Sequence, residues 1–93
     1  MSLTGTLTFD STAPWQISRH VSLRDESFGA LAYHHVNRRL VFLKSKPLVA
    51  IVRDLANFPT AREAIAAHVD EAEVARYEKA LSSLVPSDII NGR

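Results

Sequence analysis

The hydrophobic pattern of this 93-residue chain changes period at Ser45-Lys46-Pro47, and this change constrains the fold more than any other feature. Before this point apolar and polar residues alternate in short runs, as they do in β-strands. After it, apolar residues recur at the three- and four-residue spacing of helices. Ser45 is a suitable helix N-cap, and Pro47 fits the first turn of a helix, where a missing N–H does no harm. The sequence therefore predicts strands in the first half and helices in the second.

Three antiparallel strands are expected before Ser45. In the first of them Trp15, Ile17, Val21 and Leu23 alternate with polar residues, which is typical of a half-buried strand. The second predicted turn contains an asparagine, which tolerates the positive φ of a tight hairpin. The predicted strands cover residues 15–24, 28–34 and 40–44, with turns at 25–27 and 36–38.

The third predicted strand is apolar at every position from Leu40 to Leu43. Both of its faces are therefore expected to be covered. Helices can cover only one face of a three-stranded sheet, so the pattern suggests a second partner on the other face. The alternative is that Val41 is simply an exposed β-forming residue.

Three helices are expected after the strands. They run from residue 46 to Phe58-Pro59, from a capping box at 60–63 to about residue 68, and from a capping box at 70–73 to Pro86. Helices this short are marginal in isolation, so their apolar stripes must dock on the sheet. The order predicts an α+β domain that is winged-helix-like, with a three-stranded antiparallel sheet followed by three helices.

The chain is expected to form one domain with a short extension at each end. Residues 1–14 are polar and are predicted to be a flexible N-terminal arm, in which residues 7–9 could form one short strand. Residues 15–86 make up the predicted folded domain. Residues 87–93 are predicted to be a loose C-terminal tail.

Composition excludes several classes of function. Apolar residues make up 46% of the chain and charged residues 23%, which is ordinary for a soluble globular protein. The formal net charge of +1 provides no global field to attract nucleic acid or a membrane. The absence of cysteine excludes disulfides, thiolate metal sites and cysteine nucleophiles. With no signal-like start and no apolar run of about 20 residues, we expect a cytoplasmic protein.

The sequence offers little for catalysis. Its four histidines are the only candidates for a base or a metal site, and the adjacent pair His34-His35 must point to opposite faces of a strand. There is no glycine-rich phosphate loop, catalytic triad or carboxylate pair at usable spacing. We therefore expect no enzyme activity, no cofactor and no metal.

The charged feature that stands out is a cluster of four cations within nine residues, without an acid among them. One interpretation is protection of an edge strand, since lysine and arginine deter edge-to-edge aggregation. The other is strand addition, in which an extended acidic peptide pairs with an open sheet edge beside the last helix. The residues predicted to bind such a peptide are Arg38, Arg39, Leu40, Val41, Phe42, Leu43, Lys44, Lys46, Val74, Tyr77, Glu78 and Leu81.

Other interpretations of the same pattern are a winged-helix DNA-binding regulator and an assembly module without a peptide ligand. The reading helix of a regulator should be basic, but residues 70–79 contain four acids against Arg76 and Lys79. We therefore expect no nucleic-acid partner. An open strand edge also permits a homodimer through strand pairing, which would compete with the peptide.

The stretch from Arg24 to His34, continued by Arg38-Arg39-Leu40 and Phe42-Leu43-Lys44-Ser45, resembles the peptide chaperones of mycofactocin systems. These chaperones belong to the PqqD-like family of precursor-peptide recognition domains. The resemblance extends over about residues 15 to 88. The chain departs from the pattern at His35, where an aromatic residue is common, and at Val41, where a small polar residue is common.

The resemblance implies a non-catalytic protein. Such a domain binds the acidic leader of a short ribosomally made precursor peptide and presents it to a radical S-adenosylmethionine maturase. The leader is expected to lie as an extra strand against the third strand and the third helix.

Overall fold

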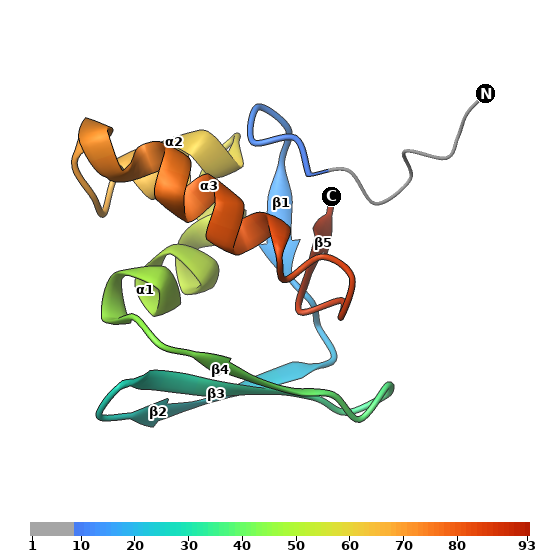
Figure 1. Ribbon diagram of the computed structural model, residues 1–93. Helices are drawn as coiled ribbons and strands as arrows, with labels where there is room; N and C mark the ends of the chain where they lie inside the picture. The colour runs from blue at the N-terminus through green and yellow to red at the C-terminus, as the bar shows by residue number, and fades with distance from the viewer. Residues whose placement is uncertain (1–8) are drawn as a thin grey trace.

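The computed structural model describes residues 9–93 (Figure 1). Residues 7 and 8 of the predicted short strand and most of the predicted arm lie outside these residues, and Phe9 belongs to no strand. The elements in chain order are β1 (Trp15–Ile17), β2 (Val21–Glu26), β3 (Gly29–His34), β4 (Leu40–Leu43), α1 (Lys46–Asp54), the 3-10 turn η2 (Leu55–Asn57), α2 (Ala61–Ala66), the 3-10 turn η3 (Glu71–Glu73), α3 (Val74–Ser82) and β5 (Ile90–Gly92).

Strands β2, β3 and β4 form an antiparallel sheet in that order, and the three helices lie over one of its faces (Figure 1). Ala30 of β3 pairs with Leu43 of β4, and Tyr33 pairs with Leu40. This confirms the predicted α+β class, with a three-stranded antiparallel sheet followed by three helices.

The first predicted strand and the predicted loose tail are both wrong. The strand is interrupted at residues 18–20, where the Val21 N–H donates to the Ser18 carbonyl at 3.1 Å. Its first part, β1, leaves the main sheet and pairs with β5, so that Ile17 lies opposite Ile90. Ile89 and Ile90 are fully buried. The chain end is therefore part of the fold, because two large apolar residues there reach the core.

The first turn begins two residues later than predicted. Asp25 and Glu26 belong to β2, and Glu26 pairs with Gly29, so the turn consists of Ser27 and Phe28. Gly29 has a φ of 149°, and a Cβ atom there would lie 2.0 Å from the Leu43 carbonyl oxygen. Only glycine allows β4 to approach this turn so closely.

Two of the three predicted helix caps are confirmed. The Ser45 hydroxyl accepts from the Leu48 N–H at 3.2 Å, and the Thr60 hydroxyl accepts from the Glu63 N–H at 3.1 Å. Asp70 forms no such side-chain bond, and the turn η3 precedes α3 instead. The third helix is therefore shorter at both ends than the sequence predicts.

The core lies between the sheet and the helices. Ala30 and Ala32 are fully buried on the covered face, and their small side chains let α1 approach β3 closely. Ile51 and Val52 of α1 and Leu81 of α3 fill the space above them. None of the helices within residues 9–93 is long and apolar enough to cross a membrane.

The described part of the predicted arm packs against the body. The Ala61 N–H donates to the Ala13 carbonyl at 3.1 Å, and the Arg62 N–H donates to the Ser11 carbonyl at 2.8 Å. The rings of Phe9 and Trp15 lie 4.9 Å apart. Residues 9–14 thus occupy the N-terminal end of α2, where free amide groups need acceptors.

Candidate functional site

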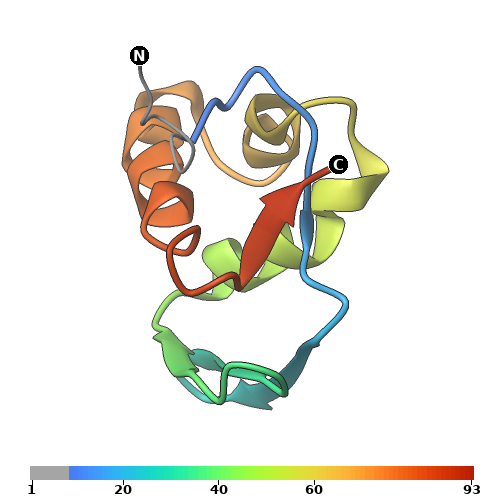
Figure 2. The same cartoon turned by 90° about the vertical axis from the view of Figure 1, so that its right-hand side faces the viewer.

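Strand β4 is an edge strand of the sheet. Within residues 9–93 it pairs with β3 on one side and with no strand on the other. Figure 2 shows β4 at the margin of the sheet, with α3 above it on the same side of the molecule. The side of β4 facing away from β3 is thus open for a further strand.

The register shows which backbone groups face this open side. The His34 N–H donates to the Arg39 carbonyl at 2.9 Å, and hydrogen-bonded positions alternate along an antiparallel pair. Val41 and Leu43 therefore direct their N–H and C=O groups toward β3. The backbone groups of Leu40 and Phe42 point to the free edge.

Side chains of β4 alternate between a covered and an open face. Leu43 is buried and Val41 is half-buried, on the side of the helices. Leu40 and Phe42 point to the opposite face and are 55% and 54% exposed. Within the single chain the helices thus cover one face of this strand and leave the other face open, so cover of the second face by a partner stays a prediction. The alternative that Val41 is an exposed residue is wrong.

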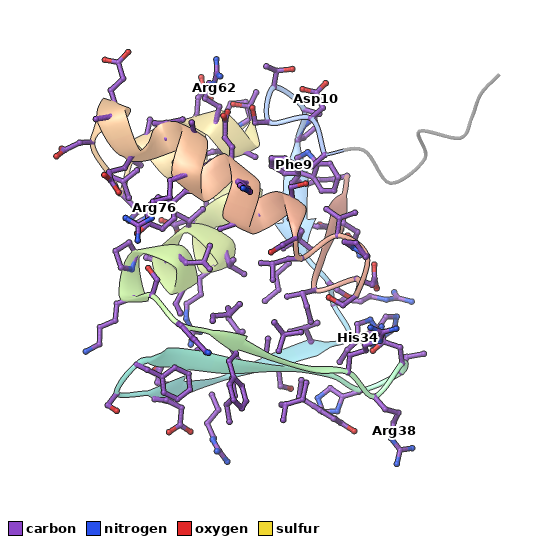
Figure 3. All side chains as sticks on the ribbon, in the orientation of Figure 1. Phe9, Asp10, His34, Arg38, Arg62 and Arg76 are labelled. Carbon is purple, nitrogen blue, oxygen red and sulfur yellow. The ribbon has the colours of Figure 1, made fainter. Side chains whose placement is uncertain are left out.

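The four cations predicted at the site are exposed and lie along or beside β4. Within residues 9–93, Arg38, Arg39, Lys44 and Lys46 take part in no ion pair. Figure 3 shows Arg38 projecting away from the helices into solvent. These charges are available to an external acidic group, because no carboxylate of the described chain neutralises them.

Of the four residues of α3 that were predicted at the site, two are buried beneath the helix. Tyr77 is buried, and its hydroxyl lies 3.3 Å from the Ser45 hydroxyl at the end of β4. Leu81 is fully buried in the core. Tyr77 is thus the predicted α3 residue that a hydrogen bond links to the end of the edge strand.

Glu78 and Val74 face another part of the molecule. The Glu78 carboxylate accepts hydrogen bonds from Ser11 Oγ at 2.5 Å and from Arg62 Nε at 3.2 Å. Together with Val74 it lines a hollow of about 580 Å³ between α2 and α3. The structure therefore places Glu78 against Arg62 and the arm.

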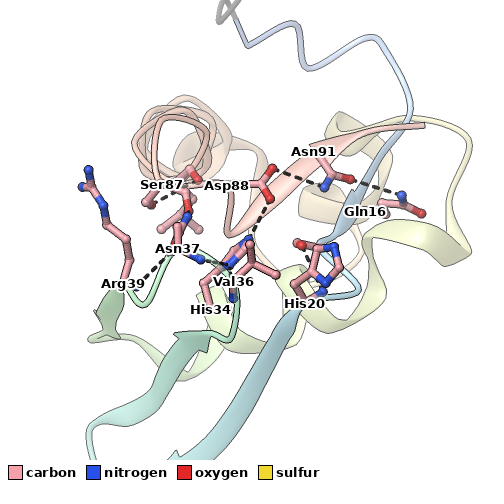
Figure 4. Close-up of polar contacts among 11 residues, drawn as sticks. Gln16, His20, His34, Val36, Asn37, Arg39, Ser87, Asp88 and Asn91 are labelled. Carbon is pink, nitrogen blue, oxygen red and sulfur yellow. Dashed lines mark hydrogen bonds and ion pairs between the residues drawn. The ribbon is translucent and has the colours of Figure 1, made fainter.

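A polar cluster that no pattern in the sequence indicates holds the β3–β4 turn against the chain end (Figure 4). His34 is 3% exposed, its Nε2 lies 2.8 Å from Asp88 Oδ2, and its Nδ1 accepts from the backbone N–H groups of Val36 and Asn37. The Asn37 side chain donates to the Ser87 carbonyl at 2.9 Å. We call His34, Asn37, Ser87 and Asp88 the turn clasp.

The turn clasp reaches the start of the edge strand. Asn37 Oδ1 accepts from the Arg39 N–H at 2.9 Å, and Arg38 has a φ of 68°. Partial burial alone would raise the pKa of Asp88, but hydrogen bonds from His34 and Asn91 outweigh it and hold that pKa below its ordinary value. The ionised carboxylate thus anchors a buried histidine below the turn.

The part of the chain that the structure describes shows no arrangement suited to a metal. Among residues 9–93 there is no group of three or more histidine, cysteine, aspartate or glutamate side chains that could hold an ion. His34 and His35 point to opposite faces as predicted, with His34 in the clasp and His35 at 2.6 Å from Ser22 Oγ on the open face.

Comparison with known proteins assigns the family. Residues 14–91 match the Peptide chaperone MftB family. The chain is 45% identical to the peptide chaperone MftB of Mycobacterium ulcerans over 83 residues, which is 88% of this chain and 76% of the relative. It is 42% identical over 85 residues to that of Mycolicibacterium smegmatis, covering 90% of this chain and 83% of the relative, and 40% identical over 83 residues to that of Mycobacterium tuberculosis, covering 88% and 76%. No solved structure matches the chain. This protein belongs to the Peptide chaperone MftB family.

Proposed function

We propose that the protein is a non-catalytic chaperone that binds the leader of a short ribosomally made precursor peptide by strand addition to β4. It then presents the peptide to a radical S-adenosylmethionine maturase. The observation that carries the proposal is the free edge of β4, where the backbone groups of Leu40 and Phe42 point outward beside unpaired cations. Family membership supports a chaperone role.

The arrangement of charge supports an acidic guest. Arg39 lies at one end of the four-residue strand and Lys44 at the other, so an extended guest would pass both. Exposed charges of this kind steer association more than they add affinity. The backbone hydrogen bonds to Leu40 and Phe42 would supply affinity that does not depend on which side chains the guest carries.

The charges of η3 and α3 argue against a nucleic-acid partner that is bound through the last helix. The exposed charges of η3 and α3 are mixed, and Arg76 is paired with Glu73 at 2.8 Å. A helix that enters a groove between phosphates needs unpaired cations. We propose a cytoplasmic protein whose partners are the leader and the maturase.

The test compares two substitutions at one position of the edge. Phe42→Pro removes the outward N–H, and Phe42→Thr keeps it in a good β-forming residue. Proline is tolerated in an edge strand where its nitrogen faces solvent, so both variants should retain the circular dichroism of the folded domain.

Binding of a synthetic acidic leader peptide is then measured by calorimetry. The Phe42→Pro variant should bind the leader about tenfold more weakly or worse. One backbone hydrogen bond is lost, and the pairing of the neighbouring residues with the guest is disturbed. Phe42→Thr should retain far more of the affinity. If the proline variant is folded and binds the leader as tightly as the wild type, strand addition at β4 is wrong.

A further inference from the structure

The open face of the main sheet carries most of the exposed large apolar side chains of the described chain. Within residues 9–93 these are Phe28, Val36, Leu40 and Phe42, which are 41%, 65%, 55% and 54% exposed. Val36 lies in the β3–β4 turn. The other three lie on or beside the face that points away from the helices, and the rings of Phe28 and Phe42 lie 5.8 Å apart.

Leu40 and Phe42 have neighbours on one flank only. Across the sheet Leu40 lies opposite Tyr33 and Phe42 lies opposite Leu31, both of β3. Leu31, Tyr33 and Leu40 line a shallow hollow of about 390 Å³ on this face. On the other flank is the free edge of β4, so the apolar surface continues up to the position that an added strand would occupy.

We propose that Leu40 and Phe42 contact side chains of the bound peptide on this open face and thereby select its sequence. The guest would carry two apolar residues separated by one position, with an acidic residue two positions beyond each of them. This inference rests on the proposed strand addition, and it names the chemical class of peptide that the edge selects.

The spacing follows from strand geometry. Residues of an added strand alternate between the two faces, so the residues opposite Leu40 and Phe42 are two apart. Directly opposite side chains in an antiparallel pair have Cβ atoms about 4.5–5.5 Å apart, close enough for apolar contact. Arg38 and Lys44 lie just outside β4, two residues before Leu40 and two residues after Phe42, and both are exposed. Arg38 belongs to the β3–β4 turn, and Figure 3 shows its side chain pointing away from the helices. The edge therefore presents the order cation, apolar, apolar, cation, and the complementary guest carries acid, apolar, apolar, acid.

The size and charge of this face favour a peptide over a second copy of the chain. Three strands about 5 Å apart and about 20 Å long offer a face of roughly 300 Å², and stable protein interfaces bury about 800 Å² on each partner. Two copies facing each other would also bring the cations Arg38 and Lys44 of both chains to one interface. A peptide that already pairs with the edge needs only two further contacts.

The test uses two synthetic heptapeptides of equal composition, acetylated and amidated at their ends. The first is Glu-Thr-Val-Thr-Val-Thr-Glu, and the second, Val-Thr-Glu-Thr-Glu-Thr-Val, exchanges the acidic and apolar positions. Their dissociation constants are measured by titration while the amide signals of the isotope-labelled protein are followed by nuclear magnetic resonance. The first peptide should bind roughly tenfold more tightly, since several cross-strand pairs each contribute a small factor.

Three variants assign the preference to the open face. Leu40→Thr and Phe42→Thr keep β-forming residues at the edge and should each reduce the preference for the first peptide by about threefold. Leu31→Thr makes the same kind of change on the middle strand, one strand further from the guest, and should leave the preference intact. A loss in the Leu31 variant equal to that in the Leu40 and Phe42 variants would mean that some other partner covers the whole face, and would overturn the inference.

Equal binding of the two peptides, or no measurable binding of either, would also overturn it. The proposed function fails separately. If Phe42→Pro leaves the binding of a complete acidic leader unchanged, strand addition itself is wrong. If that variant loses binding and the two heptapeptides bind equally, strand addition stands and selection by Leu40 and Phe42 does not.

Discussion

Reversing the charge at both ends of the edge strand should weaken leader binding about 30-fold. Arg39 and Lys44 are exposed and take part in no ion pair within residues 9–93, so Arg39→Glu with Lys44→Glu breaks no described salt bridge. An exposed ion pair contributes about 0.2–1 kcal/mol, and reversal also adds a repulsion of similar size. Each reversal therefore costs roughly 1 kcal/mol, and two cost about 2 kcal/mol, or about 30-fold in Kd.

Calorimetry with an acidic leader at low salt and at about 1 M salt measures this effect. The Debye length falls from about 8 Å at physiological salt to about 3 Å at 1 M, so most of the difference between the variant and the wild type should vanish at high salt. The association rate should fall more than the dissociation rate rises, because the cations act mainly during encounter.

A control variant with the same net charge separates local from global electrostatics. Arg19→Glu with Lys79→Glu also takes the net charge from +1 to −3, since each of the two reversals subtracts two charges. Lys79 lies two residues after the buried Tyr77 and thus on the opposite side of α3. The control should change the affinity by less than about threefold. Unchanged affinity in the Arg39 and Lys44 variant, or an equal loss in the control, would refute the role of the basic edge.

Three further predictions concern the fold that supports this edge. Gly29→Ala should lower the free energy of unfolding by about 2–4 kcal/mol in urea denaturation, because the new Cβ would strike the Leu43 carbonyl; a loss under about 0.5 kcal/mol would contradict the tight approach. Ile90→Ala should cost about 2–5 kcal/mol, and deletion of residues 87–93 should abolish cooperative unfolding; a folded deletion variant would show that the chain end is dispensable. Asp88 has a folded-state pKa below its ordinary value of 3.8, so its stabilising effect is complete above that pH and is lost as the pH falls through the folded pKa. Asp88→Asn should therefore destabilise at neutral pH by an amount that shrinks as the pH falls below 3.8, and a difference that stays constant through this acid range would exclude the carboxylate charge as the cause.

The order of the elements from β2 to α3 could be predicted because local patterns determine it. Ser45 and Thr60 cap α1 and α2 as their positions suggest, and the change of period separates the sheet from the helices. The basic residues could be placed at an edge strand for the same reason. These features depend on neighbouring residues in the chain.

The role of the chain end could not be predicted, because its partners are distant in sequence. β5 has three residues and pairs with β1 near the other end of the chain. Ile89 and Ile90 are adjacent, so they show no alternation. Asp88 meets His34 across 54 positions, and nothing near either residue indicates that contact.

The direction of the side chains in β4 was also ambiguous. Four consecutive apolar residues fit either phase of a strand, and only pairing with Ala30 and Ala32 decides that Val41 and Leu43 face the helices. The exposure of Leu40 and Phe42 follows from that register. Tertiary pairing therefore determines which face of the strand a guest peptide meets.

Amide hydrogen exchange along β4, with and without an acidic leader peptide, tests the central claim most directly. In the free protein the N–H groups of Val41 and Leu43 should be protected by β3, and those of Leu40 and Phe42 should exchange rapidly. Bound leader should slow exchange at Leu40 and Phe42 by at least about tenfold and change the other two far less. If the leader binds and the Leu40 and Phe42 amides still exchange at their free rates, the peptide does not pair with this edge.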